Sequence, residues 1–149
     1  MIKSLFTLIA AVLLVFSFGL NPNKNKPDYT MIPRATQLDT ALAASMERGA
    51  QVYLDFCQQC HMPDGKGLEG VYPPLAASDF LKKNRKQSIH AVKYGLSGEI
   101  TVNEKKYNTP MPGPGLYDEE TVDVLNYIMN SWGNKQEIVT QEEVDAVKE

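Results

Sequence analysis

Residues 57–61 read Cys57-Gln58-Gln59-Cys60-His61, two cysteines three positions apart with a histidine directly after the second. This order is typical of covalent attachment of a c-type haem. Each thiol can add to one of two adjacent vinyl groups of a porphyrin, and the histidine then lies beneath the iron as its proximal ligand. The chain contains only 2 cysteines, so none is left for a disulfide. The motif therefore predicts one covalent haem c bound through Cys57 and Cys60, with His61 on the iron.

Two other chemistries use a Cys-x-x-Cys pair, and both are alternatives to haem attachment. A thioredoxin-like redox couple belongs to an alternating pattern of strands and helices, which does not surround this motif. A zinc site needs four ligands, and beyond Cys57, Cys60 and His61 the chain offers one more histidine, His90, and no second cysteine pair. A non-haem thiol or zinc module is therefore the weaker interpretation.

The spacing of apolar residues predicts three main helices. The first is expected over 45–57, the second over 87–94 and the third over 118–133, with serine or aspartate as the N-cap of the first and third. Residues that favour strands lie on both sides of a two-residue turn within 99–107 and predict a small hairpin. We therefore expect an all-α domain with one hairpin.

Among the methionines, Met111 is the best candidate for a sixth ligand on the iron. It lies between Pro110 and Pro112, where the prolines fix the backbone and no helix claims the side chain. His90 is the rival ligand but lies on a predicted helix. The other methionines lie in the N-terminal segments, beside the proximal histidine or at helical spacing among apolar residues: Met1, Met31, Met62, Met46 and Met129. A thioether ligand raises the reduction potential, so the pattern indicates a carrier of relatively high potential.

The stretch 45–134 resembles a class I cytochrome c, a small mono-haem electron carrier whose iron has histidine and methionine ligands. Besides the haem motif, the resemblance rests on the Tyr-x-x-x-Met-Pro pattern of 107–112 and on the closing segment 118–134. That segment is most similar to the cytochrome c subunits of membrane alcohol dehydrogenases and terminal oxidases. The resemblance implies a cytochrome c fold, with three main helices around a covalently bound haem.

The resemblance also implies roles for single residues. Met111 matches the iron ligand of the family, and Leu75 matches a leucine that packs on the haem, although an ordinary core leucine is an equal alternative. Gly49 and Tyr53 match a glycine and an aromatic residue that contact the C-terminal helix. Glu104 stands where a related cytochrome has a glycine in Val-Asn-Gly, which argues against a tight mirror-image turn there.

The ends of the chain predict its organisation. Residues 1–20 have a positive start and an apolar run at 5–20, which indicates a cleaved signal peptide or, as the alternative, an N-terminal membrane anchor. A polar linker is expected over 21–40, the cytochrome domain over 41–134, and a tail with a short helix over 135–149. Either form of the N-terminus places the domain outside the cytoplasm, in the periplasm or an equivalent compartment.

Together these features predict a periplasmic or extracytoplasmic c-type cytochrome that transfers single electrons. Its expected partners are redox proteins: a dehydrogenase or quinol-oxidising complex as donor and a terminal oxidase as acceptor. It is expected to be a carrier rather than an enzyme, on its own or as a subunit of an oxidoreductase complex. A haem-based redox enzyme or gas sensor with a labile sixth ligand is the alternative. The formal net charge of −3 gives no basic excess that would indicate nucleic acid.

Overall fold

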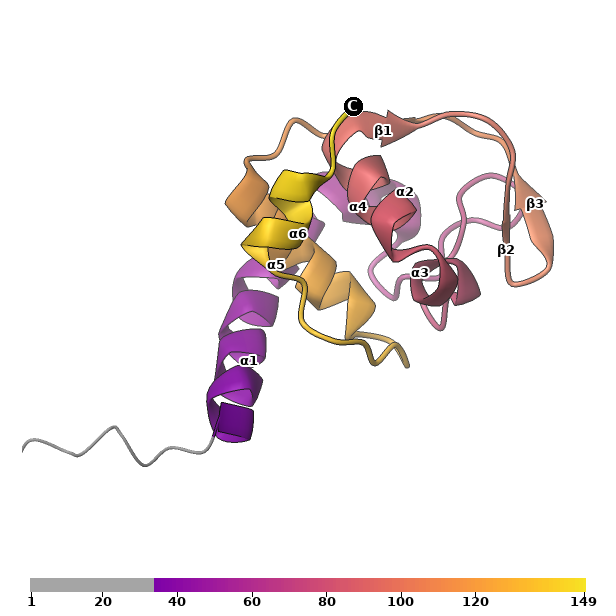
Figure 1. The fold of residues 1–149 in the computed structure, drawn as a ribbon. Coiled ribbons are helices and arrows are strands. Elements are labelled where there is room, and N and C mark those ends of the chain that lie inside the picture. Colours follow the sequence, from indigo (N-terminus) through magenta and orange to yellow (C-terminus); the bar gives the residue numbers. More distant parts are fainter. Residues whose placement is uncertain (1–33) are drawn as a thin grey trace, which may run out of the picture. The chain divides into compact units, whose positions relative to one another are not determined.

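Helices carry most of the regular structure in residues 34–149, the part of the protein described by the computed structural model (Figure 1). The predicted leader or anchor, and the linker up to residue 33, lie outside the described residues. The helices are α1 (Arg34–Val52), a π-helical turn η2 (Tyr53–Cys57), α2 (Gln58–His61), α3 (Asp79–Lys83), α4 (Arg85–Tyr94), α5 (Asp118–Met129) and α6 (Gln141–Ala146). The strands are β1 (Gly95–Leu96), β2 (Ile100–Val102), β3 (Lys105–Tyr107) and β4 (Met111–Pro112).

The start of the first helix was predicted wrongly. α1 begins at Arg34, not near Ser45, and so includes residues 34–40 of the expected linker. Alanines and other residues with good helix propensity fill its first turns, which favours the longer helix. Ser45 is buried and is not a cap, because its hydroxyl donates to the carboxylate of Asp123 on α5 at 2.7 Å. A tertiary contact therefore uses the side chain that the sequence assigned to local capping.

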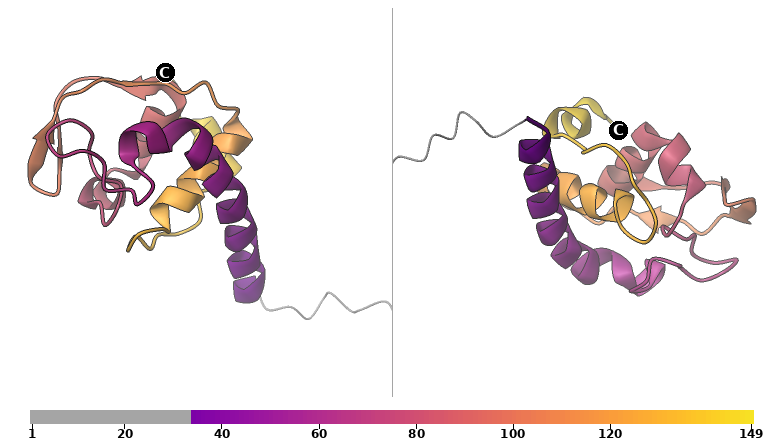
Figure 2. Two further views of the ribbon diagram at one scale, coloured as in Figure 1. Left: turned by 180° about the vertical axis from the view of Figure 1, so that it is seen from behind. Right: turned by 90° about the horizontal axis from the view of Figure 1, so that it is seen from below.

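α1 and α5 cross closely, and both views of Figure 2 show them side by side. Gly49 makes the crossing possible, since a Cβ atom there would fall on the backbone carbonyl of Asp123. Just beyond the crossing, the ring of Tyr53 lies 5.5 Å from that of Tyr127 and 4.9 Å from that of Trp132, centroid to centroid. The contacts implied for Gly49 and Tyr53 are thus present in the structure.

Both ends of the closing helix differ from the prediction. Asp118 is the first helical residue, not the cap, and the carboxylate of Glu120 accepts from the backbone N–H of Tyr117 at 2.9 Å. The helix ends at Met129, short of the expected end at residue 133. The side chain of Asn130 bonds the backbone on both sides of the helix end, and Trp132 takes a φ of +49°. A polar side chain that satisfies the backbone in this way competes with further helix.

The remaining predicted elements are present. β2 and β3 pair antiparallel around Asn103 and Glu104, whose φ angles of +48° and +66° give the tight mirror-image turn despite the glutamate. Thr140 caps α6 as predicted, and Val144 beyond it is fully buried. A second pair, β1 with β4, joins the end of α4 to the segment of Met111 and was not predicted. None of the helices in residues 34–149 combines the length and apolar character needed to span a membrane.

Gly49→Ala tests the close crossing through the sign of its effect. Helix propensity alone would raise the free energy of unfolding by up to about 1 kcal/mol. Overpacking against Asp123 is expected to outweigh the gain in helix propensity. The free energy of unfolding, measured with denaturant, should therefore fall by about 1–3 kcal/mol. The exposed Ala44 on the same helix provides the control. Ala44→Gly should lower the free energy of unfolding only by the difference in helix propensity between alanine and glycine. A Gly49→Ala variant more stable than the wild type would contradict the crossing.

Candidate functional site

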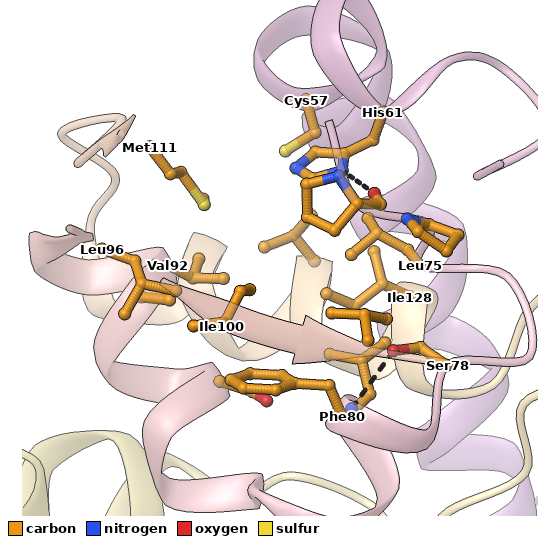
Figure 3. Close-up of a pocket in the computed structure, with 17 residues that line it drawn as sticks. Cys57, His61, Leu75, Ser78, Phe80, Val92, Leu96, Ile100, Met111 and Ile128 are labelled. Atoms are coloured by element: carbon orange, nitrogen blue, oxygen red, sulfur yellow. Dashed lines mark hydrogen bonds between the residues drawn. The ribbon is translucent and has the colours of Figure 1, made fainter. Parts of the chain in front are cut away.

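An apolar hollow opens between α4, α5, strand β2 and the loop that follows the Cys-x-x-Cys-His motif (Figure 3). The walls come from side chains of the hydrophobic core and its edge: Leu81, Val92, Leu96, Ile100, Val124 and Ile128. Such a lining favours a large, flat, mostly apolar group.

The residues singled out from the sequence converge on this hollow. Cys57, His61, Leu75 and Met111 all line it. Cys60 lines a second hollow that shares both His61 and Met111 with the first. In Figure 3 the sulfur of Met111 and the ring of His61 lie on opposite sides of the space, with Leu75 below the histidine. Residues from segments far apart in the chain therefore surround one site.

His61 is held in one orientation. Its side chain is buried, and Nδ1 lies 3.0 Å from the carbonyl oxygen of Pro73. With Nδ1–H as donor to that carbonyl, Nε2 keeps its lone pair for a metal, a common arrangement for iron-ligating histidines. Burial lowers the pKa of His61, which favours the neutral imidazole that ligation requires. Sequence reasoning missed the role of Pro73, whose only signal was its place in the Pro-Pro-Leu segment 73–75.

Met111 owes its position to the strand pair that the sequence did not reveal. Leu96 on β1 pairs with Met111 on β4, and Gly95 pairs with Pro112. Gly95 has a φ of +90°, and a Cβ there would lie 2.6 Å from the carbonyl oxygen of Met111. The rival ligand, His90, packs on Tyr94 with ring centres 5.2 Å apart and is not among the residues that line the hollow of His61.

Cys57 does not have the electrostatics of a reactive redox thiol. Burial, reinforced by the neighbouring Cys60, raises the pKa of the Cys57 thiol to about 11. Thiol–disulfide enzymes depend instead on a lowered thiol pKa. Both residues are partly exposed: Cys57 ends the π-helical turn η2, a kind of irregularity often found at functional sites, and Cys60 lies in α2. Within residues 34–149, no group of three or more His, Cys, Asp or Glu side chains is placed to hold a metal ion.

The site fits a covalently bound haem. Apolar walls suit the porphyrin face, two thiols stand at the rim, and the donor set of one imidazole nitrogen and one thioether sulfur is typical of cytochrome iron. The agreement between the site and a haem therefore depends on residues from several segments that line the same hollow, and not on the Cys-x-x-Cys-His motif alone.

Comparison with known proteins agrees with this site. The sequence profile of the family described as cytochrome c matches residues 46–132. The chain belongs to the cytochrome c family. Members bind haem c covalently, and the spacing of Cys57 and Cys60 fits their haem attachment motif. The structure accordingly has the cytochrome c fold, and the sequence resemblance to a class I cytochrome c is confirmed.

Several cytochromes c are similar to this chain. Cytochrome c-552 of Thermus thermophilus is 38% identical over 102 residues, which cover 65% of this chain and 68% of that protein. The cytochrome c subunit of the quinone alcohol dehydrogenase of Gluconobacter oxydans is 37% identical over 89 residues, covering 58% of this chain but only 18% of that subunit. Cytochrome c6 of Gracilaria tenuistipitata var. liui is 32% identical over 95 residues, covering 62% of this chain and 78% of that protein.

Gly95→Ala tests whether the backbone of β1 supports that of Met111. Gly98 provides a matched control, because its φ of +93° is also positive but a Cβ there would meet nothing within 4 Å. The positive φ disfavours alanine at both positions, the backbone of Gly95 (φ +90°, ψ 177°) lies in a region that is essentially restricted to glycine, and only Gly95→Ala adds a clash with β4. Thermal unfolding of the haem-loaded protein should therefore show a clearly larger loss for Gly95→Ala. Equal losses would contradict the close contact.

Proposed function

We propose that the protein is an extracytoplasmic mono-haem electron carrier in which His61 and Met111 are the two axial ligands of the iron and Cys57 and Cys60 attach the haem. The observation that carries this proposal is the placement of an imidazole and a thioether on opposite sides of one apolar hollow. The bound haem supplies a one-electron couple between ferrous and ferric iron. His61 and Met111 would hold the iron between them, which would leave no position on the metal for a substrate.

The surrounding residues tune and protect the site. Pro73 orients His61 through its carbonyl, and β1 supports the backbone of Met111. The apolar walls exclude water and disfavour the higher charge of ferric iron, which adds to the thioether in raising the reduction potential. Leu75 lines the hollow together with His61 and would pack on the bound haem. The chain's contribution is therefore to bind, orient and dehydrate, with no acid or base required.

The partners of this carrier are proposed from its relatives and from its rim. Similar chains are cytochrome subunits of alcohol, fructose and gluconate dehydrogenases, which supports a dehydrogenase as donor. A quinol-oxidising complex as the other donor and an oxidase as acceptor are proposed from the resemblance of residues 118–134 alone. The exposed rim includes Pro63, Pro112 and Gly113, all uncharged. Such a rim suits brief apolar docking with weak charge steering. Residues 1–20, as leader or tether, support a location outside the cytoplasm.

Met111→Ala tests the proposed ligand set. The near-infrared charge-transfer band between methionine sulfur and ferric iron should be present in the wild-type protein and absent in this variant. The reduction potential should also fall, because the thioether is lost. Met46→Leu is the control, because Met46 lies on α1 and does not line the hollow. The charge-transfer band of the Met46→Leu protein should be the same as that of the wild-type protein.

The alternative function gives the opposite result. A haem-based redox enzyme or gas sensor with a labile sixth ligand would lack a stable methionine band in the wild-type protein. It would also take up cyanide at the ferric iron as readily as Met111→Ala does. Either result would contradict the carrier proposal.

A further inference from the structure

Lys93, on α4, is a buried cation that the haem site does not use. Its side chain is only 8% exposed, and Nζ forms an ion pair with Asp118 at the start of α5, at 3.1 Å. Nζ also donates to the carbonyl oxygens of Val144 at 2.9 Å and Val147 at 3.4 Å. All three donor hydrogens of the ammonium thus have acceptors, the condition under which a lysine is tolerated in such a position.

These bonds tie α4 to the end of the chain. We call residues 137–147, which contain α6, the C-terminal strap. Next to Lys93, the hydroxyl of Tyr94 donates to the carbonyl of Val147 at 3.2 Å. At the other end of α4, Arg85 donates to both carboxylate oxygens of Glu143 at 2.8 Å. Figure 1 shows the C-terminus beside β1, where α4 ends. The strap therefore holds α4 at both ends.

The end of α4 continues directly into the support of Met111. Lys93 and Tyr94 are its last two residues, and β1 begins at the next position, Gly95. In residues 34–149, β1 is the one strand that pairs with β4, which carries Met111. Any displacement of the end of α4 therefore reaches the backbone of Met111 through a single strand pair.

We propose that Lys93 is a positioning residue for the sixth ligand, and that the C-terminal strap acts through it to set how readily Met111 leaves the iron. Departure of Met111 requires β4 to open locally, and the free energy of such local opening depends on the contacts that hold the segment closed. The hydrogen bonds of Lys93 and Tyr94 hold the end of α4 in place, and with it strand β1, which pairs with β4. This inference rests on the proposed function, because it takes Met111 as the ligand.

The test is the rate at which imidazole replaces the methionine ligand in the ferric haem-loaded protein. At saturating imidazole this rate is limited by the departure of the methionine, and loss of its charge-transfer band reports it. Lys93→Met keeps the apolar stem but removes the donors, and should raise the rate by about tenfold, because bonds to a charged group are lost. Tyr94→Phe removes one neutral hydrogen bond and should raise the rate by about threefold.

A matched variant separates positioning from general stability. Ala44→Gly weakens α1 at an exposed position away from α4 and the strap, and it should destabilise the protein without accelerating imidazole entry. Acceleration by Lys93→Met and Tyr94→Phe beyond that of Ala44→Gly supports the proposal. Equal rates in all three variants overturn it. If Lys93→Met does not fold, the comparison of Tyr94→Phe with Ala44→Gly decides the question.

Failure of this proposal and failure of the proposed function give different results. If the wild-type protein has no methionine band, Met111 is not the ligand and the proposed function fails first. If the band is present and is lost in Met111→Ala, but Lys93→Met and Tyr94→Phe exchange ligands no faster than Ala44→Gly does, only the role of Lys93 is wrong.

Discussion

Burial of a large apolar group inside the helical domain is the interaction on which the rest of this structure depends. Leu75, Leu96 and Ile100 line the hollow and are only partly buried by the protein. Apolar surface removed from water contributes about 25 cal/mol per Å², and a porphyrin in the hollow would cover the surface that these side chains leave exposed. The haem therefore completes the core, and the same contact that stabilises the fold gives the iron its apolar surroundings.

The helices that frame the hollow are held by a buried polar network as well as by apolar packing. Asp123 on α5 accepts from Ser45 and, in a bidentate pair, from Arg48, both on α1. Asn126, one turn further along α5, bonds Ser45 and both backbone groups of Val139 in the strap. Two segments, α1 and the strap, are thus fixed around one face of α5, while its other face remains available to the haem.

The local sequence predicted the haem motif, the hairpin and the helix capped by Thr140, because each depends on residues close together in the chain. Met111 was predicted as the iron ligand because the other methionines were less suitable and because its segment resembles that of class I cytochromes c. In the structure Met111 lines the same hollow as His61. The pairing of Met111 with Leu96 has no local signal. Likewise, Lys93 gives no sign of being buried until α5 and α6 are packed against it. The start of α1 was missed because Ser45 resembled a cap, whereas its partner lies far away on α5.

The central claim, that haem completes the core, is tested most directly by the amide NMR spectrum of the full chain without haem. Cys57→Ser combined with Cys60→Ser prevents covalent attachment, and the haem-loaded wild-type protein gives the reference. The account predicts a collapsed spectrum with poor dispersion, because the side chains around the hollow lose their main contact. A well-dispersed spectrum, with the amides of α4 and α5 close to their positions in the haem-loaded protein, would contradict it.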